Sequence, residues 1–436
     1  MNAGSYRLLV GAAALLVGCS ASPKPQIDAV SGGTPAASPA GTGAGAGGSS
    51  GIPSAPAAAG APDVGRKDAG APDSGSAGVS GAPGSQAGMG MSMAGAPADE
   101  DSGTAPPAPT FAIGADITWV QADEARGATY SDGTRKDILR LLRDHGFNYV
   151  RLRTFVDPKA ADGYDRADGF GDLAHTIAFG KRIKSANMGL VIDFHYSDNW
   201  ADPGKQCVPV AWQKLTSISA LADALHDYTA DAIRQLIAAG ARPDMVQIGN
   251  EITPGMLLHR CDAAGKPTGS NPVSGAIGNW ANLGQLLSAG SRAVKEIDPA
   301  ILVMLHIDKG DDLATSRDFI RNARAQGVRF DVFGESCYTA YQGQPSAWRS
   351  TFTQLAAQFP DLKFVIAEYG PEQRAANDVM FELPERRGLG TFNWEPTHGG
   401  AWNTGHVLFN VSGNAYTATP DLMLYDSMVT AYQSRL

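Results

Sequence analysis

Two glutamates stand directly after short apolar segments of the chain. The segment Val246–Ile248 leads to Asn250 and Glu251, and the segment Phe364–Ala367 leads to Glu368. A pair of carboxylates at the ends of buried strands could divide the work at a glycosidic bond. One would act as general acid and base and the other as nucleophile, if the two groups lie about 5–5.5 Å apart. Either glutamate alone could equally be a helix cap or a solvated loop residue, but the pair favours catalysis.

The neighbours of the two glutamates suggest how the tasks are divided. Glu368 is expected to be the nucleophile, because Tyr338 and Arg153 stand at predicted strand ends from which they could donate hydrogen bonds to an ionised carboxylate. Glu251 is then the acid/base, and Asn250 could bind a sugar 2-hydroxyl, a contact that strengthens in the transition state. A structural ion pair within the protein interior is the alternative for Arg153.

Further candidates for substrate binding follow other predicted strands. His195, Asp198 and Trp200 come after the third strand, and Trp394 comes after the eighth. A tryptophan ring could stack on the apolar face of a sugar, although burial in the core is the alternative for each of them. For His195 the alternative is a structural hydrogen bond near the site.

No metal or cofactor is predicted. The eight histidines are scattered, and the chain contains no HExxH motif. A structural calcium ion would be compatible with an extracellular hydrolase, but the sequence identifies no ligand set for it.

The elements that must position these side chains alternate between short apolar runs and amphipathic stretches, a pattern typical of βα units. Predicted helices include 135–145, 218–239, 283–296 and 314–325. The predicted strands are 112–117, 149–153, 189–194, 245–249, 301–306, 332–334, 364–367 and 390–393. Eight such units predict a (β/α)8 TIM barrel over residues 109–436, in which all strand ends open on one face. A GxGxxG motif after the early strands, which would indicate a dinucleotide-binding sheet, is missing from the sequence.

The N-terminal quarter has a different composition. Residues 20–108 are dominated by Gly, Ala, Pro and Ser and contain no Phe, Trp or Tyr, so we expect a disordered linker. Residues 1–19 resemble a secretory signal peptide, and Leu16–Cys19 is similar to a bacterial lipobox with lipid attachment at Cys19. An ordinary signal with an incidental cysteine is the alternative. The expected location is outside the cytoplasm, lipid-anchored at the outer membrane or cell surface and not spanning it.

The remaining cysteines and the net charge narrow the environment and the partners. Cys207 and Cys261 could form a disulfide in an exported protein, but pairing does not follow from sequence, and Cys337 reads as a small buried side chain. The formal charge of −9 argues against nucleic acid as a partner. The charge does not disfavour binding of a neutral polymer. We expect the protein to be a monomer.

Several longer motifs resemble glycoside hydrolase family 53, the endo-β-1,4-galactanases. These motifs are Gly114–Trp119, His145–Arg153, Asp193–Asp198 continuing through 200–206, and Gln247–Glu251 followed by Gly255–Leu257. The resemblance covers nearly all of residues 111–436. It implies a retaining (β/α)8 hydrolase of β-1,4-galactan in pectic arabinogalactan, with Glu251 as proton donor and Glu368 as nucleophile.

Some positions depart from the family pattern, and they leave alternatives open. The departures are the segment around Tyr369, Asn393 in the eighth strand, and an insertion containing Cys261 and 267–272. They are expected to lie around the subsites, which places linkage preference in question. The alternatives are a retaining hydrolase of another β-linked galactan or related polysaccharide, and a non-catalytic surface protein that binds carbohydrate.

Overall fold

The structure is a computed structural model that describes residues 110–399 and 407–436. The predicted signal segment 1–19 with Cys19 and the predicted linker 20–108 lie outside the described residues. Within the described ranges, no helix combines the length and the apolar character needed to cross a bilayer.

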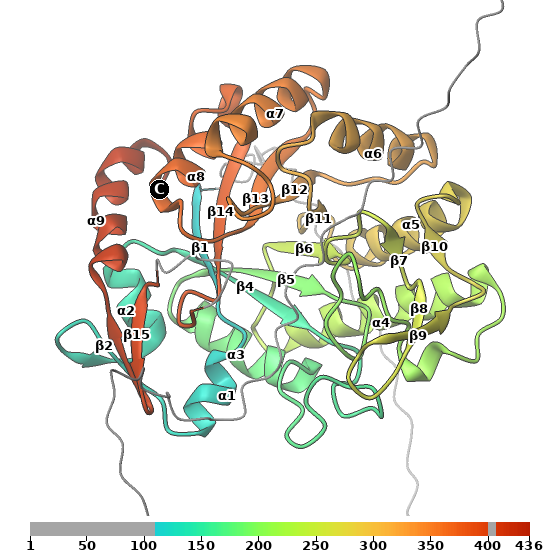
Figure 1. Cartoon of the computed structure of the whole chain (residues 1–436), viewed down its shortest axis with the longest axis horizontal. Helices are drawn as coiled ribbons and strands as arrows, with labels where there is room; N and C mark the ends of the chain where they lie inside the picture. Colours follow the sequence, from blue (N-terminus) through green and yellow to red (C-terminus); the bar gives the residue numbers. More distant parts are fainter. Residues whose placement is uncertain (1–109, 400–406) are drawn as a thin grey trace, which may run out of the picture. The chain divides into compact units, whose positions relative to one another are not determined.

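Eight parallel strands close into a barrel in the order β1-β14-β13-β12-β11-β6-β5-β4 (Figure 1). The strands are β1 (Ala112–Asp116), β4 (Tyr149–Thr154), β5 (Gly189–Phe194), β6 (Met245–Ile248), β11 (Leu302–Ile307), β12 (Val332–Cys337), β13 (Lys363–Tyr369) and β14 (Gly388–Trp394). Each corresponds to one predicted strand, so the predicted barrel is confirmed.

Side chains of each strand alternate between the inside and the outside of the barrel, as the two-residue period requires. The inside holds a small apolar cluster that includes Val191, Met245, Met304, Val365 and Phe392. The outward-facing residues join a second and larger apolar cluster with the helices. The interior is therefore a packed core, and only its carboxyl end is left for chemistry.

The helices that surround the barrel begin at side-chain caps in most cases. They are α1 (Val120–Ala125), α2 (Ile138–Asp144), α3 (Leu173–Ser185), α4 (Ile218–Ala238), α5 (Trp280–Ile297), α6 (Leu313–Ala325), α7 (Pro345–Gln358), α8 (Gln373–Phe381) and α9 (Pro420–Tyr432). The predicted helix 135–145 is wrong at its start, because Arg135–Lys136 forms the short strand β3. The Asp137 carboxylate then accepts the N–H groups of Leu139 and Arg140, which begins α2 one residue later.

Additional short strands form small sheets outside the closed barrel. β2 (Thr129–Ser131), β3, β15 (Phe409–Ser412) and β16 (Ala415–Ala418) form one sheet, in which β16 pairs with β2. The connection after β6 contains the pair β7 (Gly255–Met256) and β10 (Gly275–Ala276) and the hairpin β8 (His259–Cys261) and β9 (Pro267–Ser270). The insertion seen in the sequence is therefore an ordered hairpin that follows the strand leading to Glu251.

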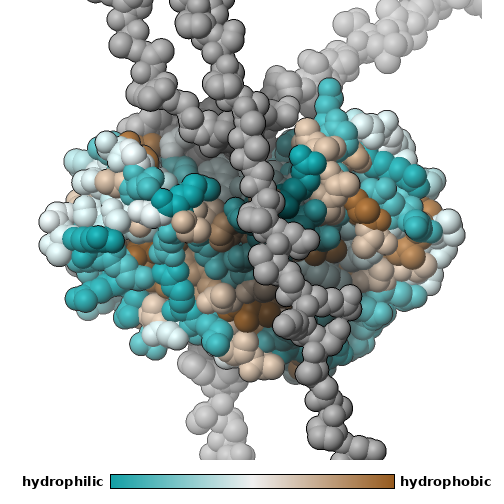
Figure 2. Space-filling view, turned by 90° about the horizontal axis from the view of Figure 1, so that it is seen from below, coloured by the Kyte–Doolittle hydropathy of each residue, from teal (hydrophilic) through white to brown (hydrophobic). Residues whose placement is uncertain are grey.

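One face of the described part of the molecule is mostly hydrophilic, with hydrophobic residues scattered between the polar ones (Figure 2). The large exposed hydrophobic residues come from several separate elements, for example Val210, Ile277 and Val411. Isolated apolar residues of this kind are normal on a protein surface.

Candidate active site

A layer of polar side chains fills the carboxyl end of the barrel. Its members are the inward-facing residues Asp116, Arg151, Asp193, Gln247, His306, Ser336 and Glu368, and all of them are buried. They come from seven different strands, because in a parallel barrel the carboxyl ends of all strands lie on the same side. Residues scattered along the sequence thus form one hydrogen-bonded network.

A β-bulge in β13 turns Glu368 toward this layer. Ile366 pairs with Glu335 and Glu368 pairs with Ser336, so Ala367 is an extra residue on β13. Regular alternation would have placed Glu368 on the helix side, since Val365 and Ala367 already belong to the inner cluster. An extra residue of this kind redirects a side chain, and it is a frequent device next to active sites.

A left-handed turn presents Glu251 after the carboxyl end of β6. Gly249 has φ +80° and Glu251 has φ +46°, which is uncommon for a residue other than glycine. The buried amide of Gln206 donates to the carbonyl oxygens of Asn250 at 2.8 Å and Glu251 at 3.4 Å. The loop after β5 therefore supports the turn that carries Glu251.

Arg151 is the arginine that contacts Glu368. Its Nη1 donates to Glu368 Oε1 at 3.2 Å and to Asp116 at 2.6 Å. Its other N–H groups donate to Asp193 at 2.8 Å, Asn250 at 2.9 Å and Gln247 at 3.1 Å. Burial opposes the charge, but the nearby carboxylates outweigh it and hold the pKa of Arg151 above its ordinary value.

The sequence had assigned this contact to Arg153, and that assignment is wrong. Arg153 donates to Asp116 and to Glu395, and its guanidinium lies 4.6 Å from the centre of the Trp200 ring. The alternative of a structural ion pair describes Arg153 better. Arg151 was missed although it shares the inward face of β4 with Arg153, two residues away, a relation that strand alternation could have revealed.

Tyr338 follows β12 and donates its hydroxyl to Glu368 Oε2 at 2.9 Å. Burial raises the pKa of Tyr338 well above its ordinary value, and the charges of Glu368 and Glu251 raise it further. The phenol therefore keeps its proton and remains a donor to Glu368.

Ser336 contacts the other glutamate and His306 contacts Ser336, and neither was predicted from the sequence as a site residue. Ser336 Oγ donates to Glu251 Oε1 at 2.7 Å and lies 3.0 Å from His306 Nε2. Ligand-type atoms of Glu251, His306 and Glu368 all lie within 4.8 Å of one another. The two predicted carboxylates thus converge, and the same three side chains are also of a type that binds metal ions.

Asn250, the two predicted tryptophans Trp200 and Trp394, and Trp119, which was not predicted as a site residue, lie close to this network. Asn250 receives Arg151 on its Oδ1 and donates to the carbonyl oxygen of Ala201 at 2.9 Å. Trp119, Trp200 and Trp394 pack edge to face with ring centres 5.6–6.2 Å apart and surround the Arg153 guanidinium. Trp394 is almost fully buried, whereas Trp119 and Trp200 are half-buried.

Glu395, which was not predicted as a site residue, contacts the cluster formed by the three tryptophans and Arg153. It has φ +42° and accepts hydrogen bonds from Arg153 and from the backbone N–H of Trp119. Burial raises the pKa of Glu395 to about 7, although the Arg153 charge opposes the shift.

Two other predicted site residues have structural partners. His195 receives the N–H of Ala201 on Nδ1, and its Nε2 lies 3.1 Å from Asp193 Oδ2. Asp198 accepts the backbone N–H groups of Asp157 and Val210 at 3.0 and 2.7 Å. Burial raises the pKa of Asp198 to about 7. These contacts tie loops together, which fits the structural alternative for His195.

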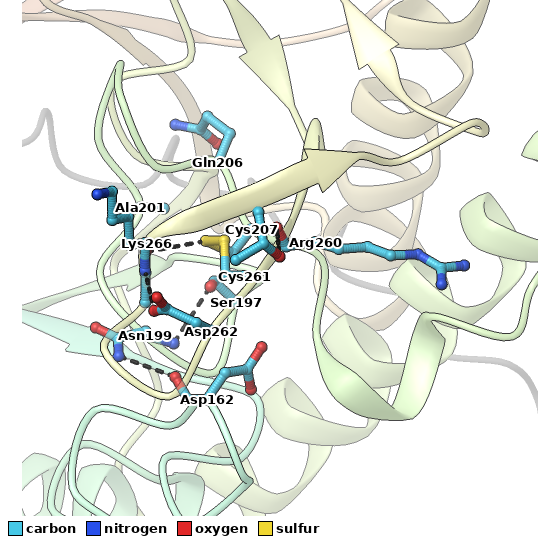
Figure 3. Close-up of a disulfide and its surroundings, with 12 residues drawn as sticks. Asp162, Ser197, Asn199, Ala201, Gln206, Cys207, Arg260, Cys261, Asp262 and Lys266 are labelled. Atoms are coloured by element: carbon cyan, nitrogen blue, oxygen red, sulfur yellow. Dashed lines mark hydrogen bonds between the residues drawn. A yellow bond between two sulfur atoms is a disulfide. The ribbon is translucent and has the colours of Figure 1, made fainter.

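A disulfide joins Cys207 and Cys261, whose Cα atoms lie 5.9 Å apart (Figure 3). It connects the loop after β5 to the β8–β9 hairpin. Cys207 directly follows Gln206, so the link lies next to the support of the Glu251 turn. Cys337 is free and buried.

Two of the departures from the family pattern lie away from the site. The Tyr369 hydroxyl pairs with Tyr425 of α9 at 2.7 Å, and Asn393 donates to Gly370 and to the same tyrosine. Both residues occupy outward positions of their strands. The expectation that they surround the subsites is therefore wrong. The inserted hairpin, in contrast, is linked by the disulfide to the loop that supports the Glu251 turn.

A closed (β/α)8 barrel with two glutamates converging at the carboxyl ends of its strands defines a glycosidase. Residues 112–382 match the sequence profile of glycosyl hydrolase family 53. The chain belongs to that family.

Known proteins support the same assignment. The arabinogalactan endo-β-1,4-galactanase of Thermothelomyces thermophilus is 32% identical over 350 residues, which is 70% of this chain and 96% of that protein. The endo-β-1,4-galactanase of Bacillus subtilis is 33% identical over 315 residues, which is 72% of this chain but only 66% of that protein. The solved GH53 catalytic domain of Ignisphaera aggregans superposes with a TM-score of 0.63 and 29% identity, covering 73% of this chain and 97% of that domain.

Proposed function

We propose that the protein is a retaining endo-β-1,4-galactanase that acts on the galactan side chains of pectic arabinogalactan. Glu251 is the acid/base in this proposal and Glu368 is the nucleophile. The observation that carries the mechanism is the approach of the two carboxylates, which have oxygens within 4.8 Å of each other. Retaining enzymes need about 5–5.5 Å between the carboxyl groups, whereas inverting enzymes need roughly 6.5–9.5 Å to admit a water molecule.

In the first step the Glu368 carboxylate attacks the anomeric carbon while Glu251 gives its proton to the glycosidic oxygen. The bond between the anomeric carbon and the glycosidic oxygen breaks, and the leaving sugar departs with the proton. Arg151 and Tyr338 donate to the two oxygens of Glu368, which supports an ionised nucleophile before the attack.

In the second step the Glu251 carboxylate removes a proton from water, and the water oxygen attacks the glycosyl ester. Glu368 leaves as a carboxylate, and both groups return to their starting states. Asn250 is held by Arg151 beside Glu251, a place from which it could contact the sugar 2-hydroxyl. The half-buried rings of Trp119 and Trp200 offer apolar faces for further sugar units.

The substrate is tested by measuring reducing-sugar release from β-1,4-galactan, β-1,3-galactan, arabinan, xylan and mannan. Cleavage of β-1,4-galactan alone is the expected result. Cleavage of another polymer instead would assign the protein to the alternative hydrolase of a different β-linked polysaccharide. Polarimetry or NMR of the first-formed product then checks retention, and an inverted anomer would refute the proposed mechanism.

A surface protein that only binds carbohydrate is separated from an enzyme by Glu368→Ala. An enzyme loses turnover but keeps oligosaccharide binding, because the tryptophans are untouched. Identical behaviour of the variant and the parent protein in both assays would favour the binding protein.

We also propose that the protein is exported and lipid-anchored through Cys19 at the outer membrane or cell surface. The lipobox-like Leu16–Cys19 supports this proposal, and so does the Cys207–Cys261 disulfide, because such bonds persist in oxidising compartments. Labelled palmitate should be incorporated into the parent protein and not into Cys19→Ala. Equal labelling of both would refute the anchor.

A further inference from the structure

Ser336 lies between Glu251 and His306 and contacts both. Its Oγ is 2.7 Å from Glu251 Oε1 and 3.0 Å from His306 Nε2. Ser336 and His306 are fully buried, on the adjacent strands β12 and β11. The three side chains therefore form a short chain of hydrogen bonds that ends on the proposed acid/base.

The proton on His306 decides where the serine hydroxyl points. A serine hydroxyl has one proton to donate, and here two acceptors compete for it. When His306 carries a proton on Nε2, that N–H donates to Ser336 Oγ, and the serine proton is directed to Glu251. An imidazole without this proton would instead attract the serine proton and leave Glu251 Oε1 without its donor.

The far side of His306 is also fixed by the barrel. Its Nδ1 lies 3.0 Å from Asn250 Oδ1 and 3.1 Å from Gln247 Nε2. An acceptor and a donor are thus both within reach, so Nδ1 has a partner whether or not it is protonated. This arrangement allows Nε2 to keep its proton.

The charged and titratable groups that surround Glu251 come from several strands. Glu368 on β13 has a carboxyl oxygen within 4.8 Å, and Tyr338 after β12 senses the charges of both glutamates. Arg151 on β4 reaches Glu368 and Asn250, and Asp193 on β5 faces both Arg151 and His306. Ser336 is the neutral donor within this charged set.

We propose that Ser336 and His306 are positioning residues that anchor Oε1 of Glu251, so that its other oxygen, Oε2, exchanges the catalytic proton. The inference rests on the proposed role of Glu251. The anchor bond is present in both protonation states but strengthens when Glu251 is ionised, since hydrogen bonds to charged groups are the stronger ones. Ser336 therefore orients the acid and also favours the form that later removes a proton from water.

The test compares Ser336→Ala with the parent protein on two substrates. On β-1,4-galactan, kcat is expected to fall roughly 10- to 100-fold with little change in KM, as for the loss of one hydrogen bond to a charged group. The alkaline limb of the kcat/KM profile should move to higher pH, because the ionised form of Glu251 loses its donor. On a dinitrophenyl galactobioside the glycosylation rate should fall much less, since its leaving group needs little acid assistance.

Ser316→Ala is the matched control. Ser316 is on α6, and its Oγ donates to the buried carboxyl group of Glu335 at 2.5 Å. Glu335 is on β12, next to Ser336, and faces the helices. This variant also removes one buried hydroxyl from a carboxyl group, so it should lower Tm while leaving the pH profile and the ratio of the two substrates unchanged. If Ser336→Ala changes only Tm, as the control does, Ser336 is a packing residue and the proposal is wrong.

Glu251→Gln separates failure of this inference from failure of the proposed function. An inactive Glu251→Gln together with a normal Ser336→Ala would overturn the positioning role alone. A Glu251→Gln that still cleaves galactan at the parent rate would overturn the acid/base assignment itself, and the inference with it.

Discussion

Arg151 donates all five of its N–H groups to different side chains, which makes Arg151→Lys an informative perturbation. The acceptors are Asp116, Asp193, Gln247, Asn250 and Glu368. A lysine keeps the positive charge but has three donors, so at least two acceptors lose their hydrogen bond from residue 151.

Two lost bonds of this kind should lower the free energy of unfolding by about 2–4 kcal/mol. For a barrel of this size this corresponds to a fall in Tm of roughly 3–6 °C, which thermal unfolding monitored by circular dichroism would measure. If Glu368 is among the acceptors that lose their donor, kcat on galactan should fall roughly 10- to 100-fold. The acid limb of the pH profile should then move to higher pH, because the ionised carboxylate has lost support.

Arg153→Lys is the matched control, because Arg153 is equally buried and contacts Asp116 from the same strand. It should also lower Tm, through the loss of contacts with Glu395 and Trp200. The acid limb should stay in place, because Arg151 is the arginine that donates to Glu368. Equal shifts of the acid limb in both variants would refute the assignment of Arg151 as the arginine that supports the proposed nucleophile Glu368.

Three further predictions concern other parts of the site. Tyr338→Phe removes one donor from Glu368 and should lower kcat roughly 10-fold or more with a small change in Tm; an unchanged kcat would contradict the importance of this bond. Burial raises the pKa of Glu395 from 4.5 to about 7, so its contribution to stability is complete below about pH 4.5 and is lost as the pH rises through about 7. The fall in Tm between about pH 5 and about pH 8 should therefore be smaller in Glu395→Gln, and an identical slope would show that another group titrates. Replacing both Cys207 and Cys261 by serine should cost about 4 kcal/mol, from the chain entropy of a loop with a separation of 54 residues, and chemical denaturation with and without reductant would measure it.

The barrel could be predicted because its signals are local. Apolar runs such as Gly189–Phe194 and capped helices such as Ile218–Ala238 carry their periodicity and end signals within a few residues. The convergence of Glu251 and Glu368 also followed, because parallel strands leave all their carboxyl ends on one face.

The partners inside the barrel were less predictable. The choice of Arg153 over Arg151 failed because both face inward, and only the depth of each residue in the barrel decides which one reaches Glu368. Ser336 and His306 were not predicted as site residues, because serine and histidine are common near strand ends. Their hydrogen bond joins two neighbouring strands and is not visible in the sequence.

The sequence by itself determined the eight barrel strands, the two glutamates at their ends and the family to which the chain belongs. These follow from short-range patterns and from contiguous motifs. The tertiary structure alone decided the bulge at Ala367 that turns Glu368 inward, the five partners of Arg151 and the anchor on Glu251. Such features depend on strand register and on distances between residues far apart in the chain, and these are fixed only when the barrel closes and buried polar groups must find partners.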